Sequence, residues 1–404
     1  MIRNCIAALV VSTTLIPVCA VGQNSGPARF VYVWGGTGHH DTPGKAAVAV
    51  FDADPSSATY GSVVSVLVVD SSGRMPHHTE FSAPVNATSF FANDFGADRS
   101  WVIDFSEPRR PRVVRQLPAV AGGRMMHSFA RLPDGNVLAT LQFGDRSKEG
   151  DPGMLAEFDR NGRFVRSGSA ADKAFPGGRL RTYGITALPD IDRVVTTSSP
   201  MDNEQTEHVV QVWRLSNLEL LKTLPVPAIA GDTAHMYPFE LRTLPDGKTV
   251  FLNSYYCGFY TIARLESNPR IEPVHSLPGA VGCAVPLLDR KLMVMPIAYE
   301  HRFVTFDISN PAKPVELASL ATDTTFFPHW IAGDPGSDRI VVTDQGDGTP
   351  RIMIGRLDRA SGRITWDERF HDPGSDQPGI SLENVSWPQG IKGKFTPHGA
   401  LFIR

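Results

Sequence analysis

The chain has 404 residues, of which 42% are hydrophobic and 20% are charged, and its formal net charge is −3. This composition is that of a folded globular protein and excludes an intrinsically disordered chain. Because there is no excess of lysine and arginine to neutralise phosphates, nucleic acid is not an expected partner.

The N-terminal residues 1–20 have the pattern of a secretory signal peptide. Arg3 supplies a positive charge, and the apolar stretch that follows, CIAALVVSTTLIPV, is too short to span a membrane. Val18 and Ala20 occupy the −3 and −1 positions of a cleavage site, so we expect cleavage after Ala20 and a single domain over residues 21–404. Lipidation at Cys19 is the alternative. No later segment has the roughly 18 apolar residues of a membrane span, so the sequence predicts a periplasmic or secreted protein.

After this segment, the sequence repeats one local pattern. Each copy has a polar or small residue, a short apolar run, a turn, and a second apolar run rich in β-branched residues, which predicts strand, tight turn and strand. The clearest copies are MMHSFARLPDGNVLATL (125–141), RTYGITALPDIDRVVTTS (181–198), TAHMYPFELRTLPDGKTVFLNS (233–254), VGCAVPLLDRKLMVMPI (281–297) and FFPHWIAGDPGSDRIVVTD (326–344). The segments PHHTEF (76–81) and FTPHGALFIR (395–404) begin in the same way.

Each copy starts with one residue that we call its leading residue: His78, His127, Tyr183, His235, Cys283, His329 and His398. These residues are about fifty positions apart, with a longer interval after His329 in which we expect an extra loop or ribbon within 365–394. Further short strands lie between the copies and bring each unit to about four strands. Seven such units without a long amphipathic helix predict an all-β protein, a seven-bladed β-propeller.

The two ends of the chain complete one another in this scheme. The last unit stops after one strand, whereas the mature chain begins with three strands that have no leading residue, at 29–36, 45–53 and 61–70. We therefore expect the last blade to be closed by the C-terminal strand plus three N-terminal strands. Closure of this kind removes the free sheet edges that an open repeat would leave. The seven leading residues would then gather at one mouth of the central channel.

The opening of the mature sequence carries a family resemblance. The segment YVWGGTGHHDTPGKAAVAVFDADPSSATYGSVV followed by HHTEF resembles the selenium-binding protein family, whose bacterial members include methanethiol oxidases. The resemblance covers roughly the N-terminal hundred residues and continues in MMHSF and PHGALFI. It implies a seven-bladed propeller with a copper centre, whose histidines by motif are His77, His78, His127 and His398.

The resemblance also implies a reaction, in which methanethiol, oxygen and water give formaldehyde, hydrogen sulfide and hydrogen peroxide. A small thiol is therefore the expected substrate, and the oligomeric state is left open. One departure concerns the Cys-x-x-Cys that family members often carry after the double histidine. The corresponding stretch here, NATSFFAND, has no cysteine, which argues against selenium binding and leaves the histidine site untouched.

The chemistry of the histidines also points to a metal. Neutral imidazole binds copper, zinc, iron and nickel, and the four histidines belong to three units that are neighbours around the ring. Adjacent residues of a regular strand point to opposite faces. His77 and His78 can therefore both be ligands only if the chain bends there, and Pro76 makes such a bend credible.

Four further leading residues, Tyr183, His235, Cys283 and His329, are expected at the same channel mouth. His235 and His329 would bind substrate, move protons or complete a different metal set, or would be hydrogen-bonded plugs of the channel. Cys283 would form a disulfide with Cys257, joining the end of the fourth unit to the start of the fifth, or would stay a free thiol and a soft extra ligand.

Other polar residues are expected to have structural roles in loops and turns. His39 and His40 stand in a loop rich in Gly, Thr and Pro, which is expected at the surface and could overhang the mouth. Asp344 and Asp347 are expected to serve a turn. The alternative function is a non-catalytic propeller that carries a metal or binds a protein. A calcium-dependent hydrolase or lactonase is disfavoured, because the leading residues include several histidines and no Asp, Asn or Glu.

Overall fold

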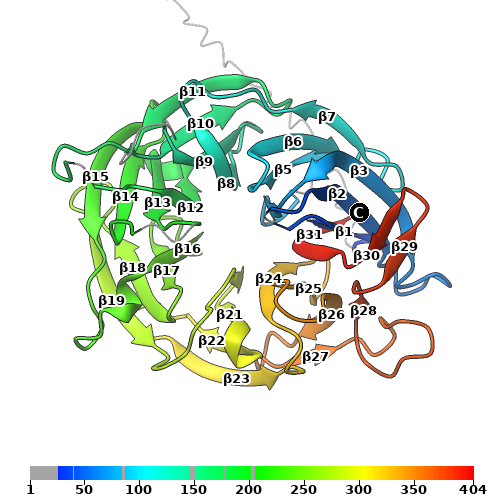
Figure 1. Ribbon diagram of the computed structural model, residues 1–404. Helices are drawn as coiled ribbons and strands as arrows, with labels where there is room; N and C mark the ends of the chain where they lie inside the picture. Colours follow the sequence, from blue (N-terminus) through cyan, green and yellow to red (C-terminus); the bar gives the residue numbers. More distant parts are fainter. Residues whose placement is uncertain (1–25, 40, 84–86, 145–150, 177, 202–204) are drawn as a thin grey trace, which may run out of the picture.

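The computed structural model describes residues 26–39, 41–83, 87–144, 151–176, 178–201 and 205–404. Seven antiparallel sheets in this part are arranged around a central channel (Figure 1), which confirms the predicted seven-bladed β-propeller. The signal peptide predicted over residues 1–20 and the histidine His40 lie outside the described residues.

Each blade has four main strands, named here from the innermost strand to the outermost. Blade one holds β4 (Pro76–Thr79), β5 (Ser89–Asp94), β6 (Arg99–Asp104) and β7 (Arg112–Gln116); blade two holds β8 (Arg124–Arg131), β9 (Val137–Phe143), β10 (Met154–Phe158) and β11 (Phe164–Ser169). Blade three holds β12 (Thr182–Leu188), β13 (Arg193–Ser198), β14 (Val209–Arg214) and β15 (Glu219–Pro225); blade four holds β16 (Pro238–Thr243), β17 (Val250–Ser254), β18 (Gly258–Ala263) and β19 (Arg270–Ser276).

Blade five holds β20 (Leu287–Asp289), β21 (Leu292–Ile297), β22 (Arg302–Asp307) and β23 (Val315–Ala321); blade six holds β24 (Pro328–Gly333), β25 (Arg339–Asp344), β26 (Arg351–Leu357) and β27 (Ile364–Trp366). Blade seven holds β31 (Thr396–Ile403), β1 (Phe30–Gly36), β2 (Gly44–Asp52) and β3 (Val63–Gly73). The described residues also include three short 3₁₀ helices, η1 (Pro189–Ile191), η2 (Ala234–Met236) and η3 (Ala298–Glu300). No helix in these ranges is long and apolar enough to cross a membrane.

The hydrophobic core lies between neighbouring blades. All seven residues of β9, VLATLQF, are buried, whereas all five of the outermost strand β7 are exposed. A middle strand is covered by a blade on each side, so its residues on both faces are apolar or paired, while an outer strand faces water. The cluster that joins blades one and two, for example, packs Phe91 and Val102 against Ala139 and Phe158.

The ring is closed by the C-terminal strand, as the sequence predicts. Strand β31 pairs antiparallel with β1, from Phe30 opposite Ile403 to Gly36 opposite Thr396, and the two ends of the coloured chain meet there (Figure 1). The predicted extra ribbon within 365–394 is also present. It consists of β28 (Ile380–Ser381), which pairs with β26, and a separate hairpin of β29 (Val385–Trp387) and β30 (Ile391–Gly393).

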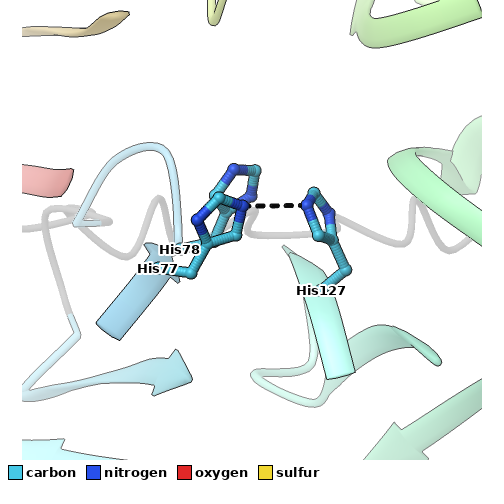
Figure 2. A group of neighbouring side chains, drawn as sticks. All are labelled: His77, His78 and His127. Carbon is cyan, nitrogen blue, oxygen red and sulfur yellow. Dashed lines mark hydrogen bonds between the residues drawn. The ribbon is translucent and has the colours of Figure 1, made fainter. Parts of the chain in front are cut away.

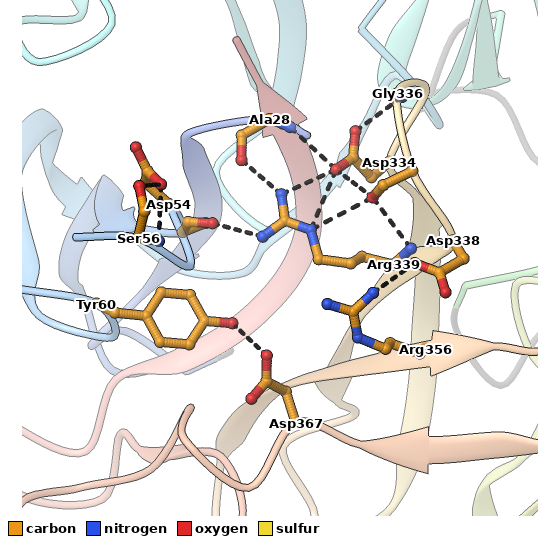
Figure 3. Close-up of polar contacts among 12 residues, drawn as sticks. Ala28, Asp54, Ser56, Tyr60, Asp334, Gly336, Asp338, Arg339, Arg356 and Asp367 are labelled. Atoms are coloured by element: carbon orange, nitrogen blue, oxygen red, sulfur yellow. Dashed lines mark hydrogen bonds and ion pairs between the residues drawn. The ribbon is translucent and has the colours of Figure 1, made fainter. Parts of the chain in front are cut away.

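A buried arginine fastens blade six to the closing blade (Figure 3). The side chain of Arg339 is 1% exposed, and its guanidinium donates hydrogen bonds to the carbonyls of Ala28 and Ala53. Its Nη2 lies 2.8 Å from the carboxylate of Asp334, which also accepts the Ala28 N–H at 3.0 Å. Arg339 therefore links blade six to two points of blade seven, Ala28 just before β1 and Ala53 just after β2.

Cys257 and Cys283 form a disulfide, with their Cα atoms 5.2 Å apart. The predicted position was partly wrong, because Cys257 lies in the turn between β17 and β18 and not at the end of blade four. This turn borders the channel mouth, where Tyr255 and Tyr256 line a cavity, and the crossover to blade five passes beside it. Because Cys283 is bonded to Cys257, it has no free thiol in this structure. The alternative in which Cys283 is an additional soft metal ligand is therefore excluded.

Candidate metal centre

The double histidine lies at a β-bulge. Pro76 pairs with Asp94 and Thr79 pairs with Ala92, so β4 has one residue more than β5 between these two pairs. Such a bulge lets two successive side chains point the same way, which a regular strand forbids. The rings of His77 and His78 accordingly stack, with centroids 4.4 Å apart and planes inclined by 15°. The same irregularity recurs at the start of β8, β12 and β16.

His127, at the corresponding position of β8, faces this pair across the gap between blades one and two (Figure 2). The Nε2 atoms of His77 and His127 are 3.0 Å apart. One ring nitrogen from each of His77, His78 and His127 lies within 4.8 Å of the other two. Two nitrogens at about 2.0–2.1 Å from a tetrahedral ion would be about 3.3 Å apart. The spacing of the three rings therefore fits a shared metal ion.

Two more imidazoles complete the cluster from the other side. The ring of His398, on β31, has its centroid 3.9 Å from that of His77 and 5.2 Å from that of His78. The ring of His329, on β24, lies 4.5 Å from that of His398. Among the described residues, Nδ1 of His398 and both ring nitrogens of His329 are buried without a hydrogen-bond partner. Buried polar atoms are normally satisfied, so these nitrogens are candidates for contact with a bound ion or small molecule.

Burial keeps the cluster neutral. It lowers the pKa of His77, His78, His127 and His398 well below the usual value, and neighbouring imidazoles lower each pKa further by disfavouring a second positive charge. Burial also lowers the pKa of His329 to about 4. An aromatic pair, Phe81 stacked on Trp330 at 5.1 Å, lies against His78. The ring nitrogens without a proton therefore offer lone pairs at neutral pH.

The backbone around the histidines is held by buried polar side chains. The N–H of His78 donates to Oδ1 of Asn93 at 2.6 Å, and Nδ2 of Asn93 donates to the carbonyls of Met126 and His127. The carbonyl of His398 accepts the hydroxyl of Thr343 at 2.6 Å. The hydroxyl of Ser128 lies 3.1 Å from Nδ1 of His78 and 2.9 Å from Nδ1 of His127. Blades one and two are thus linked through the site itself.

A cavity of about 470 Å³ opens onto the cluster. Three of the histidines, His77, His329 and His398, form part of its wall. Aromatic side chains form another part: Tyr183, Tyr237, Phe239, Tyr255 and Tyr256. A concave, largely apolar cavity with a few polar groups at one side is typical of a small-molecule site.

The remaining leading residues differ in their environments. Tyr183 lies in the site, since its ring centroid is 3.7 Å from that of His127, and burial raises its pKa well above the usual value. His235, on η2, is instead a hydrogen-bonded plug in blade four, because its Nδ1 is 2.6 Å from the carbonyl of Tyr256. Cys283 is part of the disulfide. The structure thus brings together His77, His78, His127, His398, His329 and Tyr183.

The acidic residues and the loop histidine also differ in their distance from the cavity. Asp344 accepts the N–H groups of Phe327 and Gly346 and serves its turn, as expected. Asp347 accepts a hydrogen bond from Gln345 in the same turn, as expected, but its carboxylate also lies on the cavity wall and accepts a hydrogen bond from Tyr299. His39 is exposed but also borders the cavity, so its loop does overhang the mouth.

Sequence reasoning missed two features of the site. Ser128 stands beside a histidine in MMHSF, and only the bulge shows that it faces the same way. Apart from Tyr183, the aromatic wall comes from the runs HMYPF and SYYCGF. Their clustering of tyrosine and phenylalanine beside a leading residue was the signal that could have revealed it.

Comparisons with known proteins support the fold. No protein-family model matches the sequence. No curated protein matches it either. Among solved structures, a hypothetical selenium-binding protein from Sulfolobus tokodaii is similar, with 15% identity and a TM-score of 0.74, covering 94% of each chain. The periplasmic gluconolactonase of Pseudomonas aeruginosa has 14% identity and a TM-score of 0.62, covering 93% of this chain and 99% of its own.

A third similar structure, a putative 6-phosphogluconolactonase from Bacteroides fragilis, has 13% identity and a TM-score of 0.59, covering 93% of this chain and 98% of its own. At such identities the likeness extends to the seven-bladed propeller and not to an activity, because propellers support many chemistries.

Proposed function

We propose that this protein is an exported copper-binding β-propeller that oxidises methanethiol or another small thiol. The metal would be held by His77, His78, His127 and His398. The observation that carries the proposal is the convergence of these four imidazoles from three neighbouring blades at the edge of one cavity.

The donor set fits copper in its chemistry. Imidazole ligands suit copper, zinc, iron and nickel, and a soft thiol substrate favours copper over hard cations. In the described ranges, the group of side chains spaced for a metal is made of histidines alone, without the carboxylates that calcium prefers. When bound, copper supplies a redox centre that accepts electrons from a thiol and passes them to oxygen.

The cavity supports a small apolar substrate. Tyr183, Phe239 and Tyr255 would contact the alkyl group and exclude water from it. His329 lies on the cavity wall beside His398, and its unprotonated ring nitrogen would accept a hydrogen bond from the thiol S–H. These contacts would orient the sulfur toward the histidine cluster.

Export is supported by two independent features of the chain. The N-terminal sequence has the pattern of a signal peptide, and the mature part contains a disulfide between Cys257 and Cys283. Disulfides persist in oxidising compartments such as the periplasm and are rare in the cytosol.

Elemental analysis tests the proposal. Protein from an exporting host is loaded with copper, desalted and analysed beside the variant His127→Ala/His398→Ala and the control His235→Ala, which removes a histidine outside the cluster. We expect about one copper per chain in the wild type and the control, and none in the double variant, with circular dichroism unchanged.

The other outcomes are informative as well. Absence of copper from the wild type, or its retention by the double variant, would contradict the metal site. Unfolding of the double variant would assign the histidines a structural role. If copper binds but methanethiol produces no hydrogen peroxide, the protein is a non-catalytic metal carrier, and the oxidase part of the proposal fails.

A further inference from the structure

Ser128 contacts two of the proposed ligands at once. Its Oγ lies 3.1 Å from Nδ1 of His78 and 2.9 Å from Nδ1 of His127, and all three side chains are buried. We infer that Ser128 is a positioning residue, whose single hydroxyl turns the Nδ1 edges of both rings toward itself and thereby directs both Nε2 atoms at the metal position. The inference rests on the proposed metal site and names a residue that acts through the ligands.

The position of the hydroxyl is fixed by the strand. The bulge between Met126 and Phe129 lets His127 and Ser128 face the channel together, as His77 and His78 do in blade one. The N–H of Ser128 donates to Oγ1 of Thr140 at 3.0 Å, and the Thr140 hydroxyl donates to the carbonyl of Tyr183 at 2.7 Å. This chain of bonds anchors Ser128 to β9 of its own blade and, through Thr140, to Tyr183 on the inner strand of blade three.

Proton counting limits what the two rings can do. A serine hydroxyl has one proton, so it donates to at most one imidazole and must accept from the other. At least one of His78 and His127 therefore carries its proton on Nδ1. When both rings offer Nε2 to an ion, both must carry the proton on Nδ1, and the hydroxyl oxygen, with two lone pairs, can accept from both.

Two other blades carry glycine at the position that corresponds to Ser128. The residues that follow the leading residues of blades three and seven are Gly184 and Gly399. A Cβ at Gly184 would come within 2.6 Å of the Phe239 carbonyl, and one at Gly399 within 2.7 Å of the Thr79 hydroxyl. Among Ser128, Gly184 and Gly399, the residue that lies between two proposed ligands is the one with a hydroxyl group. Such outer partners fix the orientation of metal-binding histidines, and their loss typically weakens metal affinity 10- to 100-fold.

The test compares Ser128→Ala, Ser128→Thr and the control Ser198→Ala in the full chain. Ser198 is also buried, but its hydroxyl accepts the backbone N–H of Arg181, and among the described residues it makes no hydrogen bond with a histidine. Affinity for Cu(II) is measured by competition with a chromophoric chelator. We expect Ser128→Ala to lose about 10- to 100-fold in affinity, Ser128→Thr to retain most of it, and Ser198→Ala to match the wild type.

A second readout does not depend on a metal. Nitrogen NMR of the ¹⁵N-histidine-labelled, metal-free protein reports which ring nitrogen of His78 and His127 carries the proton. We expect an Nδ1–H form for at least one of them in the wild type, replaced by the Nε2–H form in Ser128→Ala. If the wild type binds no copper but shows this change, the proposed function fails while the role of Ser128 in orienting the rings stands.

Two results would overturn the inference. One is a Ser128→Ala variant that binds copper as tightly as the wild type. The other is a wild type in which neither His78 nor His127 carries a proton on Nδ1.

Discussion

Single side chains at the channel mouth differ in whether their polar atoms have hydrogen-bond partners. His329 is buried, lines the cavity, and has no hydrogen-bond partner on either ring nitrogen among the described residues. Leaving such groups unsatisfied costs stability, and an unexplained orphan of this kind points to a ligand. The two ring nitrogens of His329 therefore mark the part of the cavity wall where a ligand would bind.

The buried His329 also predicts a pH dependence. Its pKa is lowered to about 4, whereas the unfolded chain has a value near 6.5. Above pH 6.5 both states are neutral; below it the unfolded state takes up a proton first, so stability is lost as the pH falls toward 4. At 1.36 kcal/mol per pKa unit, this loss is about 3 kcal/mol. The variant His329→Gln does not titrate and avoids it.

We therefore expect the difference in unfolding free energy between the metal-free wild type and His329→Gln to shift by about 3 kcal/mol in favour of the variant between pH 7.5 and 4. Urea unfolding at several pH values measures this, and all other titrating groups are common to both proteins. A difference that stays constant with pH would show that His329 is solvated and not buried.

Sequence reasoning could identify most of these residues, because histidines at a regular interval are unusual. It could not decide whether His77 and His78 face the same way, since that depends on a bulge set by pairing with β5. Nor could it separate His329, which borders the cavity, from His235, which donates to a nearby carbonyl. The sequence pattern assigns both to the start of a repeat, but the structure places His329 in the irregularity at the start of β24 and His235 on η2, before β16 begins.

The positions of strands and turns were the features that the sequence pattern predicted best. Alternating apolar runs separated by turns placed the inner strands and the closing strand of blade seven. The pairing of Cys257 with Cys283 could only be left open, because a disulfide requires two Cα atoms within about 7 Å. The turn after β17 brings them to 5.2 Å.

The disulfide predicts an effect on stability without an effect on the metal. It closes a loop with a sequence separation of 26, for which chain entropy gives about 3.5 kcal/mol of stabilisation. The bond joins blades four and five, whereas the proposed ligands lie on blades seven, one and two.

We expect the variant Cys257→Ala/Cys283→Ala to lose about 3.5 kcal/mol in urea unfolding and to retain its full copper stoichiometry by elemental analysis. Chemical reduction of the wild type provides an independent comparison. A fall in copper content with the fold intact would mean that the cysteines act on the metal site after all.

The whole ring depends on how its two ends meet. Strand β31 is the innermost strand of blade seven, and it also carries His398. Closure of the propeller and completion of the histidine cluster are therefore the same event. The sequence predicted this from the count of strands at each end, but it had no signal for the arginine that fastens the closure.

Arg339 holds the closed ring together at the junction of blades six and seven. It is a buried cation whose guanidinium serves the carboxylate of Asp334 and the carbonyls of Ala28 and Ala53 (Figure 3). Removing one partner of a buried ion pair leaves an uncompensated charge and typically costs 3–5 kcal/mol. We expect that loss for Arg339→Met, measured by urea unfolding of the metal-free protein.

A matched control lies nearby. Arg356 pairs with Asp338 at 2.8 Å, but its side chain is 47% exposed. Surface pairs of this kind contribute about 0–1 kcal/mol, so Arg356→Met should unfold almost like the wild type. If the two variants lose the same stability, Arg339 does not hold the ring closed, and pairing of β31 with β1 must be sufficient. If only Arg339→Met is weakened, the fastening between blades six and seven also secures the strand that presents His398.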